Sequence, residues 1–354
     1  MGPARDGHPE EEEGSDSWGL FFKLQTLEIA TNFFSDSNKL GHGGFGPVYL
    51  GLLPNGEQIA VKKLSCCIEG PEKMLVYEYL SNKSLDYFLF DEEKRATLDW
   101  KKRFEIINGI GRGLLYLHEE SPERIIHIDI KAGNILLDEQ LKPKISDFGL
   151  ARLFPWDDTH VSTFRISGTH GYMAPEYALH GYLSAKTDVF SFGILVLEIV
   201  SGRKNHDDSL EEEKSDLLSY TWNIWQEQKA PELVDPSIET RFNNEEVVKC
   251  IQLGLLCCQA SIADRPEMNA VHLMLESESF TIPKPGKPGY QGRVGRWATY
   301  SSTTATSNTK SSEHSIASTT ATSNTKSSEH SIDSTTAMTN ATYSLTSSVD
   351  DYLR

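Results

Sequence analysis

The sequence lacks any apolar run close to the roughly 20 residues that a membrane-spanning helix requires. The apolar stretch Phe192–Val200 is too short for this purpose, and it contains Glu198. The opening residues MGPARDGHPEEEE have no apolar core typical of a secretory signal. Asp6 also stands where a myristoylation signal needs serine or threonine. We therefore expect a soluble chain in the cytoplasm.

Cysteine is scarce, and its spacing excludes two of its common uses. The five cysteines are Cys66, Cys67, Cys250, Cys257 and Cys258. None of them forms the C-x-x-C pair that is typical of zinc sites, and a secreted disulfide framework would need more of them. This pattern indicates a reducing compartment.

Positive charge is also in short supply. The chain has 34 Lys and Arg residues against 51 Asp and Glu residues, so its formal net charge is −17. This balance argues against general affinity for nucleic acid or for anionic membranes. Hydrophobic residues nevertheless make up 38% of the chain, which is enough to build a packed core.

The composition divides the chain into four segments. Residues 1–21 are acidic and are expected to be disordered, whereas residues 22–80 show strand-like alternation. Residues 81–282 turn helical, with apolar residues at three- and four-residue spacing. Residues 283–354 form a Ser/Thr-rich tail that we expect to be disordered, and it repeats the sixteen residues TTATSNTKSSEHSIAS with one change.

Several individual elements follow from these patterns. Pro54-Asn55-Gly56 lies between two apolar stretches and indicates a hairpin turn. The spacing of apolar residues predicts helices over Trp100–Leu117, Val189–Ser201 and Val247–Gln259.

The segment 41–48, GHGGFGPV, matches the pattern G-x-G-x-x-G-x-V. A dinucleotide-binding fold would continue from such glycines into a helix. Here Val48–Leu52 and Gln58–Leu64 instead favour two strands joined by a turn. A glycine-rich hairpin lets backbone amides approach phosphate groups closely. Lys62 on the second strand then provides a point charge suited to phosphate oxygens.

Three further motifs follow in order: HIDIKAGN at 127–134, DFG at 147–149 and APE at 174–176. With them the chain resembles a eukaryotic protein kinase, and more narrowly a plant receptor-like Ser/Thr kinase of the cysteine-rich or S-domain lectin groups. The resemblance covers about residues 22–280 and includes MLVYEYLSNKSLDYFLF, IKAGNILLD, ISDFGLAR and GTHGYMAPEYAL. It implies a two-lobed α+β fold, with a small β-rich lobe over 22–80 that lacks its usual helix and a helical large lobe over 81–282.

The resemblance also implies roles, which suit a reaction that needs alignment and charge neutralisation more than covalent chemistry. Asp129 would accept the proton of the substrate hydroxyl, with Lys131 and Lys62 as catalytic cations. Asn134 and Asp147 would hold Mg²⁺, which prefers oxygen ligands. The implied ATP-binding residues are Gly41, Gly43, Gly46, Val48, Ala60, Lys62, Tyr77, Glu78, Leu80 and Leu136.

Lys131, two residues after Asp129, is similar to the Ser/Thr type of kinase rather than the tyrosine type, as is Thr169. Members of the family are phosphorylated between the DFG and APE motifs. The candidate hydroxyls of this activation loop are those of Thr159, Ser162, Thr163, Ser167 and Thr169. Residues with an implied structural role are Glu176 and Arg265, as an ion pair, and Asp188, as a brace of the catalytic loop.

The stretch after the lysine strand departs from the family pattern. Kinases of this family carry a helix with a glutamate and then a strand there, which need roughly 20–30 residues. Ser65–Lys73 provides nine, and SCCIEGPEK resembles the sequence that normally follows the missing strand. A contiguous block is therefore missing. Only Glu69 and Glu72 remain as nearby carboxylates for Lys62.

A second departure is Ile128, where the family usually has an arginine that binds a phosphorylated activation loop. We expect ATP-dependent phosphorylation of protein serine and threonine in receptor-like signalling, impaired by the missing helix. A pseudokinase or interaction module is the alternative, and a mis-spliced chain without a stable function is a third. The expected partners are a protein substrate and membrane receptor-like kinases, with no nucleic acid and no direct membrane span.

Overall fold

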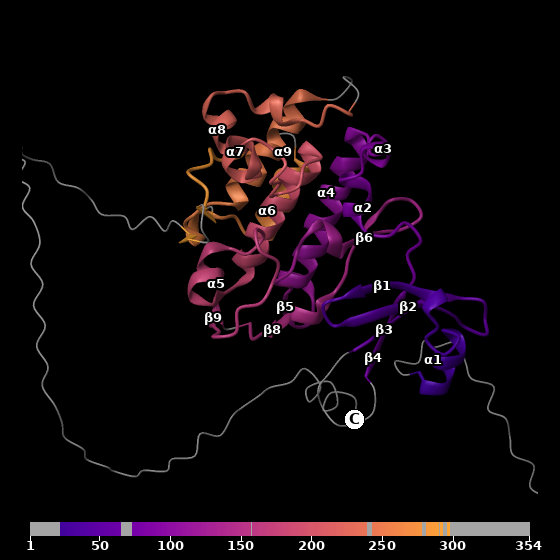
Figure 1. Ribbon diagram of the computed structural model, residues 1–354. Coiled ribbons are helices and arrows are strands. Elements are labelled where there is room, and N and C mark those ends of the chain that lie inside the picture. The colour runs from indigo at the N-terminus through magenta and orange to yellow at the C-terminus, as the bar shows by residue number, and fades with distance from the viewer. Residues whose placement is uncertain are drawn as a thin grey trace, which may run out of the picture. The chain divides into compact units, whose positions relative to one another are not determined.

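The computed structural model describes residues 22–64, 73–156, 158–238, 243–277 and 281–289, together with two short strands, β11 (Gln291–Gly292) and β12 (Arg296–Trp297). Within these residues the predicted α+β fold is confirmed. A small sheet forms one end of this part and a group of helices forms the other (Figure 1). The predictions for the acidic N-terminal segment, for the tail repeat and for Glu69 and Glu72 lie outside the described residues.

The small sheet is antiparallel and has the order β1-β2-β3-β4. Its strands are β1 (Lys39–Gly43), β2 (Gly46–Leu52), β3 (Gln58–Lys63) and β4 (Met74–Glu78). The predicted turn at 54–56 joins β2 and β3, and Gly56 adopts a φ of 85°, which favours glycine. Strands β3 and β4 are direct neighbours. Lys63 lies opposite Met74, and the Leu64 amide donates to the Lys73 carbonyl over 3.0 Å.

One helix lies inside the stretch that the sequence predicted as strand-like. Helix α1 (Leu24–Ala30) packs Leu27 and Ala30 into a small core with Ile59 and Val61 of β3. Leu27 and Ala30 are three residues apart, which is a helical and not a strand-like spacing. Helix α1 therefore covers the sheet face to which Ile59 and Val61 belong.

The large core is built around helix α6 (Ala185–Ser201). Every residue of α6 from Thr187 to Ser201 is buried, and most of these residues are apolar, as expected of a helix surrounded by other elements. It begins with a capping box between Ser184 and Thr187 and ends at Gly202, where φ is 63°. The helices around it are α4 (Trp100–Leu115), α8 (Leu217–Gln226), α9 (Asn244–Cys257) and α10 (Met268–Glu276).

Short elements complete the fold. The short helices are α2 (Leu85–Leu89), α3 (Glu92–Arg95), α5 (Pro175–His180) and α7 (Glu212–Ser215), and a π-helical turn, Tyr116–Glu120, extends α4. The strand pairs are β5 (Arg124–Ile126) with β8 (Arg152–Phe154), β6 (Ile135–Leu137) with β7 (Pro143–Ile145), and β9 (Val161–Ser162) with β10 (Tyr182–Leu183).

A buried ion pair ties helix α5 to the segment before α10. Two nitrogens of the Arg265 guanidinium donate to the two oxygens of Glu176 over 2.7 and 2.8 Å, and both residues are buried. Removing one partner of such a pair leaves an uncompensated charge, which typically costs about 3–5 kcal/mol.

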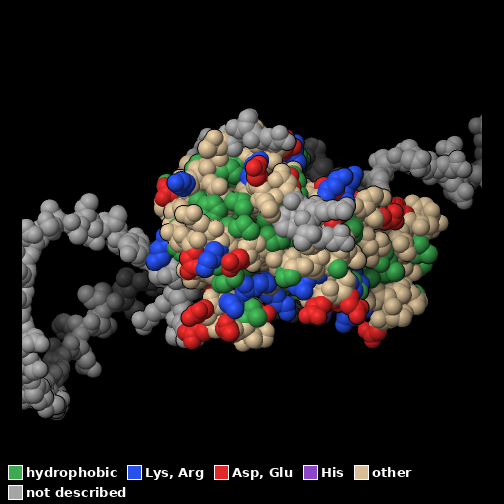
Figure 2. Space-filling model, turned by 90° about the horizontal axis from the view of Figure 1, so that it is seen from above, with side chains coloured by type: hydrophobic (Ala, Val, Ile, Leu, Met, Phe, Trp, Pro, Cys, Tyr) green, Lys and Arg blue, Asp and Glu red, His purple; other side chains and the backbone are tan. Residues whose placement is uncertain are grey.

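Two further features concern the charge of the surface and the length of the helices. On the face shown in Figure 2, Lys and Arg side chains gather between groups of Asp and Glu, so this face is not uniformly acidic. No helix within the described ranges is both long and apolar enough to cross a membrane.

Candidate active site

Asp129 is the centre of a network of short hydrogen bonds. Its Oδ1 accepts from the Thr169 hydroxyl over 2.5 Å, and its Oδ2 accepts from Lys131 Nζ over 2.8 Å and from Asn134 Nδ2 over 2.9 Å. Lys131 also donates to the Thr169 hydroxyl over 2.7 Å. Burial alone would raise the pKa of Asp129, but the hydrogen bonds from Lys131 and Thr169 hold it below its usual value. The carboxylate is therefore ionised at neutral pH and can accept a proton.

Asp188 at the start of α6 holds the loop that carries Asp129. Its two oxygens accept from the amides of His127 and Ile128, each over 2.7 Å, and from His118 Nε2 over 3.0 Å. Asp188 is fully buried. In this arrangement Ile128 has a φ of 74°, which is unfavourable for a β-branched residue.

Asn134 and Asp147 are brought together by the β6–β7 pair. Asn134 precedes β6, Asp147 follows β7, and the Ser146 amide and hydroxyl both donate to the Asn134 carbonyl over 2.9 Å. Phe148 packs its ring edge against His127, with centroids 4.9 Å apart. Two neighbouring oxygen-bearing side chains suit Mg²⁺, which is usually held by one or two such groups together with substrate phosphates. Across the described ranges, no group of three or more His, Cys, Asp or Glu side chains could hold a metal.

Lys62 reaches the same place from the small sheet. Its Nζ lies 2.7 Å from Asp147 Oδ1, and the residue is only 5% exposed. Among the described residues this is its one ion pair. Within the described residues the lysine therefore pairs with the DFG aspartate and with no carboxylate of the small lobe.

The remaining residues implied in ATP binding lie on the Lys62 face or near it. Val48 is the cross-strand partner of Lys62, and Tyr77 is that of Ala60, so all four share one face of the sheet. Burial, and then the negative charge of Asp147, raise the pKa of the Tyr77 hydroxyl. Leu136 lies in β6, Leu80 follows β4, and the Glu78 side chain pairs with Lys144 over 2.5 Å.

The same face also carries an exposed leucine. Leu75 lies opposite Lys62, and 41% of its surface is accessible to solvent. Helix α1 packs with Ile59 and Val61, which alternate with Lys62 along β3 and so point to the opposite face. Leu75, an exposed apolar side chain, is thus the cross-strand partner of Lys62.

The glycine-rich hairpin between β1 and β2 contributes a residue that sequence reasoning missed. The Phe45 ring lies with its centroid 5.2 Å from Lys62 Nζ. The aromatic residue within the glycine pattern was a visible signal. Its contact with Lys62 depends on how the hairpin folds over the sheet.

Glu198 was also missed. It is fully buried in α6, and both its oxygens lie 2.8 Å from the Tyr172 hydroxyl, while the Asn205 amide donates to Oε1 over 2.8 Å. Burial raises the pKa of Glu198 to about 8. Because Tyr172 follows Thr169 closely in the chain, this carboxyl helps to hold the segment that contacts Asp129. The signal in the sequence was a glutamate inside an apolar run.

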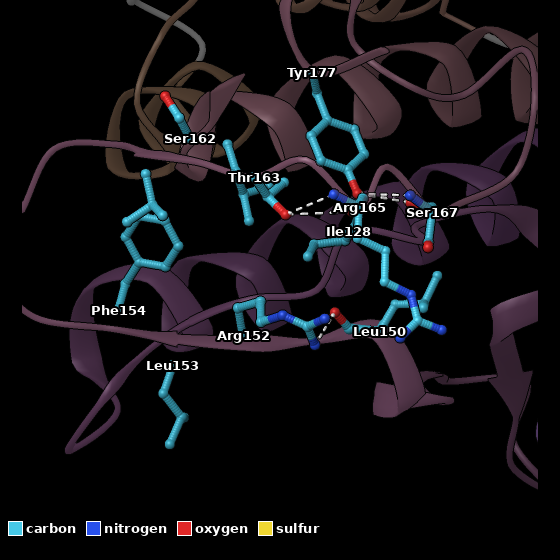
Figure 3. A pocket seen from close by; sticks show the side chains of 12 residues that line it. Ile128, Leu150, Arg152, Leu153, Phe154, Ser162, Thr163, Arg165, Ser167 and Tyr177 are labelled. Carbon is cyan, nitrogen blue, oxygen red and sulfur yellow. Dashed lines mark hydrogen bonds between the residues drawn. The ribbon is translucent and has the colours of Figure 1, made fainter. Parts of the chain in front are cut away.

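The activation-loop hydroxyls are divided among three places. Ser162, Thr163 and Ser167 line a cavity of about 220 Å³ that Figure 3 shows. Thr169 belongs to the Asp129 network, and the Thr159 hydroxyl lies 3.1 Å from His160 Nδ1. The other residues that line the cavity are Ile128, Leu150, Arg152, Leu153, Phe154, Val161, Arg165, Tyr177 and Leu183.

Ile128 forms part of the wall of this cavity, where the family usually has an arginine. Arg152 Nη1 donates to the backbone carbonyl of Leu150 over 3.2 Å (Figure 3) and to that of Ala151 over 3.0 Å. The Tyr177 hydroxyl donates to the Ser167 carbonyl over 2.9 Å. The wall at position 128 is therefore apolar, while Arg152 and Arg165 supply the basic groups.

Comparison with known proteins places these motifs in one family. Residues 60–275 match the family model described as protein tyrosine and serine/threonine kinase. This range includes Lys62, the Asp129 network and Asp147.

Curated relatives from Arabidopsis thaliana agree with this match. Cysteine-rich receptor-like protein kinase 25 is 48% identical over 296 residues, which cover 75% of this chain and 44% of the relative. Cysteine-rich receptor-like protein kinase 29 is 49% identical over 309 residues, which cover 78% of this chain and 45% of the relative. A G-type lectin S-receptor-like serine/threonine-protein kinase is 51% identical over 294 residues, which cover 75% of this chain and 35% of the relative. The chain thus spans less than half the length of these relatives. It belongs to the protein tyrosine and serine/threonine kinase family.

Proposed function

We propose that this chain transfers the γ-phosphoryl group of ATP to serine or threonine hydroxyls of proteins, within receptor-like kinase signalling. The observation that carries this proposal is the contact of Asp129 and Lys131 with Thr169. In it, the Thr169 hydroxyl donates to a carboxylate whose pKa is low. The hydrogen bond from the Thr169 hydroxyl to Asp129, over 2.5 Å, supports a role of Asp129 in binding a hydroxyl group. A substrate serine or threonine would present the same group.

The residues divide the work of phosphoryl transfer between them. Asp129 orients the substrate hydroxyl and accepts its proton, while Lys131 places a positive charge beside the same oxygen. Lys62 binds phosphate oxygens as a point charge. Asn134 and Asp147 would hold Mg²⁺, which when bound to ATP neutralises phosphate charge. Val48, Ala60 and Leu136 supply apolar contacts for the adenine ring.

The comparisons also bear on the missing block. The match to cysteine-rich receptor-like protein kinase 25 runs over 296 positions, yet it uses 75% of the 354 residues, about 266. About 30 positions of the relative thus have no counterpart in this chain. That number fits the length of one helix, one strand and their connections. The names of the relatives support the receptor-like and serine/threonine assignments.

We further propose that catalysis is slow. In the described residues Asp147 is the only ion-pair partner of Lys62. No second carboxylate among these residues therefore holds the lysine in the orientation that phosphate transfer requires. Misplacement of one catalytic charge lowers rates by orders of magnitude, roughly 10²-fold or more.

The same observation favours a second candidate function, a pseudokinase or interaction module. The pair between Lys62 and Asp147 occupies the two charges that phosphate and Mg²⁺ would need. In this candidate the large helical lobe serves as a docking surface and nucleotide is bound weakly or not at all.

A direct assay separates the two functions. Purified chain is incubated with radiolabelled ATP, Mg²⁺ and a generic protein substrate, and initial rates of labelling are compared with those of Asp129→Asn. Slow labelling that is lost in Asp129→Asn supports the kinase. Nucleotide binding without labelling supports the pseudokinase. A Thr159→Val variant, which changes a hydroxyl outside the Asp129 network, serves as a matched control.

A further inference from the structure

The cavity shown in Figure 3 is lined by parts of the chain that are far apart in sequence. Its walls come from the catalytic loop at Ile128, from 150–154 after the DFG motif, from 161–167, and from Tyr177 and Leu183. Strand β8 is paired with β5 and strand β9 with β10, and the Tyr177 hydroxyl donates to the Ser167 carbonyl over 2.9 Å. The walls are therefore fixed by hydrogen bonds within the chain.

The floor of this cavity is apolar. Ile128 is 5% exposed, and Phe154 and Leu183 are each 3% exposed, so these three side chains form its buried part. A hydrated inorganic anion would lose water against them without gaining hydrogen bonds, which is costly. The floor therefore suits a hydrocarbon group.

The rim of the cavity carries positive charge. Arg152 and Arg165 are both exposed, and none of the described residues that line the cavity is Asp or Glu. In a chain with a net charge of −17, this is a distinct local excess of positive charge. Arg152 is also held in place, because its Nη1 donates to two backbone carbonyls. A guanidinium group binds a carboxylate through two parallel hydrogen bonds, so the rim suits an organic acid.

The size of the cavity limits the ligand further. Its volume is about 220 Å³. A cavity of about 150 Å³ is enough to hold a benzene ring. The larger volume here leaves room for one ring together with a short acidic side chain.

We propose that this cavity is a binding site for a small aromatic carboxylate. The ring of the ligand would pack against Ile128, Phe154 and Leu183. Its carboxylate would accept hydrogen bonds from Arg152 and Arg165. The site is separate from the residues proposed to bind ATP and Mg²⁺, and it does not depend on the proposed phosphoryl transfer.

Phenylacetate is a suitable probe, and its binding is measured without ATP by ligand-detected saturation-transfer NMR. The wild type should bind it saturably, with a Kd of about 1 mM or tighter, as expected of a ligand with roughly ten heavy atoms. Phenylacetamide has the same shape without the charge and should bind about tenfold more weakly. Inorganic phosphate at equal concentration should not displace phenylacetate, because it has no apolar group for the floor.

Two variants and a site-specific signal locate the binding. Arg165→Met should weaken phenylacetate binding about tenfold, because it removes a charge-assisted hydrogen bond. Arg112→Met, which changes an exposed arginine of α4 outside the cavity, should bind as the wild type does. Phenylacetate should shift the methyl NMR signals of Ile128 and Leu183 and leave unchanged that of Ile59 in the small-lobe core.

Several results would overturn the proposal. They are a lack of saturable binding, equal affinity for phenylacetamide, unchanged affinity in Arg165→Met, and methyl shifts that leave out Ile128 and Leu183. Displacement of phenylacetate by an equal concentration of phosphate would also overturn it, because the site would then recognise phosphate groups. None of these measurements involves phosphate transfer, so their failure is distinguishable from failure of the proposed function.

Discussion

At the scale of single residues, Glu198 makes buried hydrogen bonds in a place that disfavours its charged form. Its carboxyl is fully buried, and Tyr172 and Asn205 are its hydrogen-bond partners. Asp86 also faces it and contributes further negative charge. A neutral carboxylic acid suits this place better than a carboxylate does, because burial penalises the charged form.

Glu198 therefore makes stability depend on pH. Its pKa is about 8 in the folded chain against an ordinary value of 4.5, so between these values the folded chain holds a proton that the unfolded chain releases. Stability should fall as pH rises through this window, by up to about 1.4 kcal/mol per pH unit. Glu198→Gln should flatten this slope and be more stable than the wild type at pH 8. Urea unfolding of both proteins at pH 6, 7 and 8 measures this dependence of stability on pH.

The matched control for this prediction is Glu105→Gln on the surface of α4. The hydrogen bond from Lys102 lowers the pKa of Glu105, so this carboxylate keeps its charge as the pH rises. The slope should be unchanged in this variant. A slope that persists unchanged in Glu198→Gln would show that another group, and not Glu198, causes it.

Ile128 carries a second prediction at this scale. Its apolar side chain in the cavity wall cannot bind a phosphate group placed on Ser162 or Thr163, whereas an arginine could. Phosphatase treatment should therefore change the rate of the wild type by less than about twofold. In Ile128→Arg the rate should become sensitive to the treatment.

Initial rates of phosphate transfer before and after phosphatase treatment measure this difference, with Ile128→Leu as an apolar control. A strong loss of activity in the wild type would mean that Arg152 and Arg165 suffice to read a phosphorylated loop.

At the scale of elements, the decisive feature is the direct pairing of β3 with β4. Inserting the helix-plus-strand block of a curated relative between Leu64 and Ser65 should supply the missing carboxylate to Lys62 and cover Leu75. The rate of phosphate transfer should rise by roughly 10²-fold. A second insertion, in which the helix glutamate is replaced by glutamine, should cover the same surface without restoring the rate. Equal rates for the two insertions would show that packing, not charge, was missing.

Elements also show where sequence reasoning succeeds. Helices α6 and α9 were predictable because their apolar runs are long, and the β2–β3 hairpin was predictable from its Pro-Asn-Gly turn. Helix α1 was not, since seven residues with two buried positions give a weak period. The contact of Lys62 with Asp147, 85 residues later, was not predicted, because the motifs assign Lys62 to phosphate and Asp147 to Mg²⁺. The packing of the Phe45 ring against Gly149 could not be predicted, because it depends on the three-dimensional course of the hairpin.

At the scale of the whole molecule, the two cores differ greatly in size. The buried residues of the small-lobe core are Leu27, Ala30, Leu53, Ile59 and Val61, whereas the large core extends from α2 to α10. A small core buries little apolar surface, so we expect the small sheet to open locally before the large lobe unfolds.

Two substitutions on α1 test this difference. Leu27→Ala removes a buried side chain that is 4% exposed and should destabilise the small lobe by about 2–4 kcal/mol. Leu24→Ala, on the same helix but 47% exposed, should cost less than about 0.5 kcal/mol. Hydrogen exchange should show faster exchange of β3 amides in Leu27→Ala alone, with α6 unchanged. Equal acceleration in α6 would mean that the chain unfolds as one cooperative unit.

The direct pairing of β3 with β4 also affects how the chain folds. Leu64 and Lys73 meet across only eight intervening residues. A shorter loop costs less chain entropy to close, and pairing that is local in sequence lowers contact order and favours faster folding. The short connection should thus let β3 and β4 pair early as the chain folds.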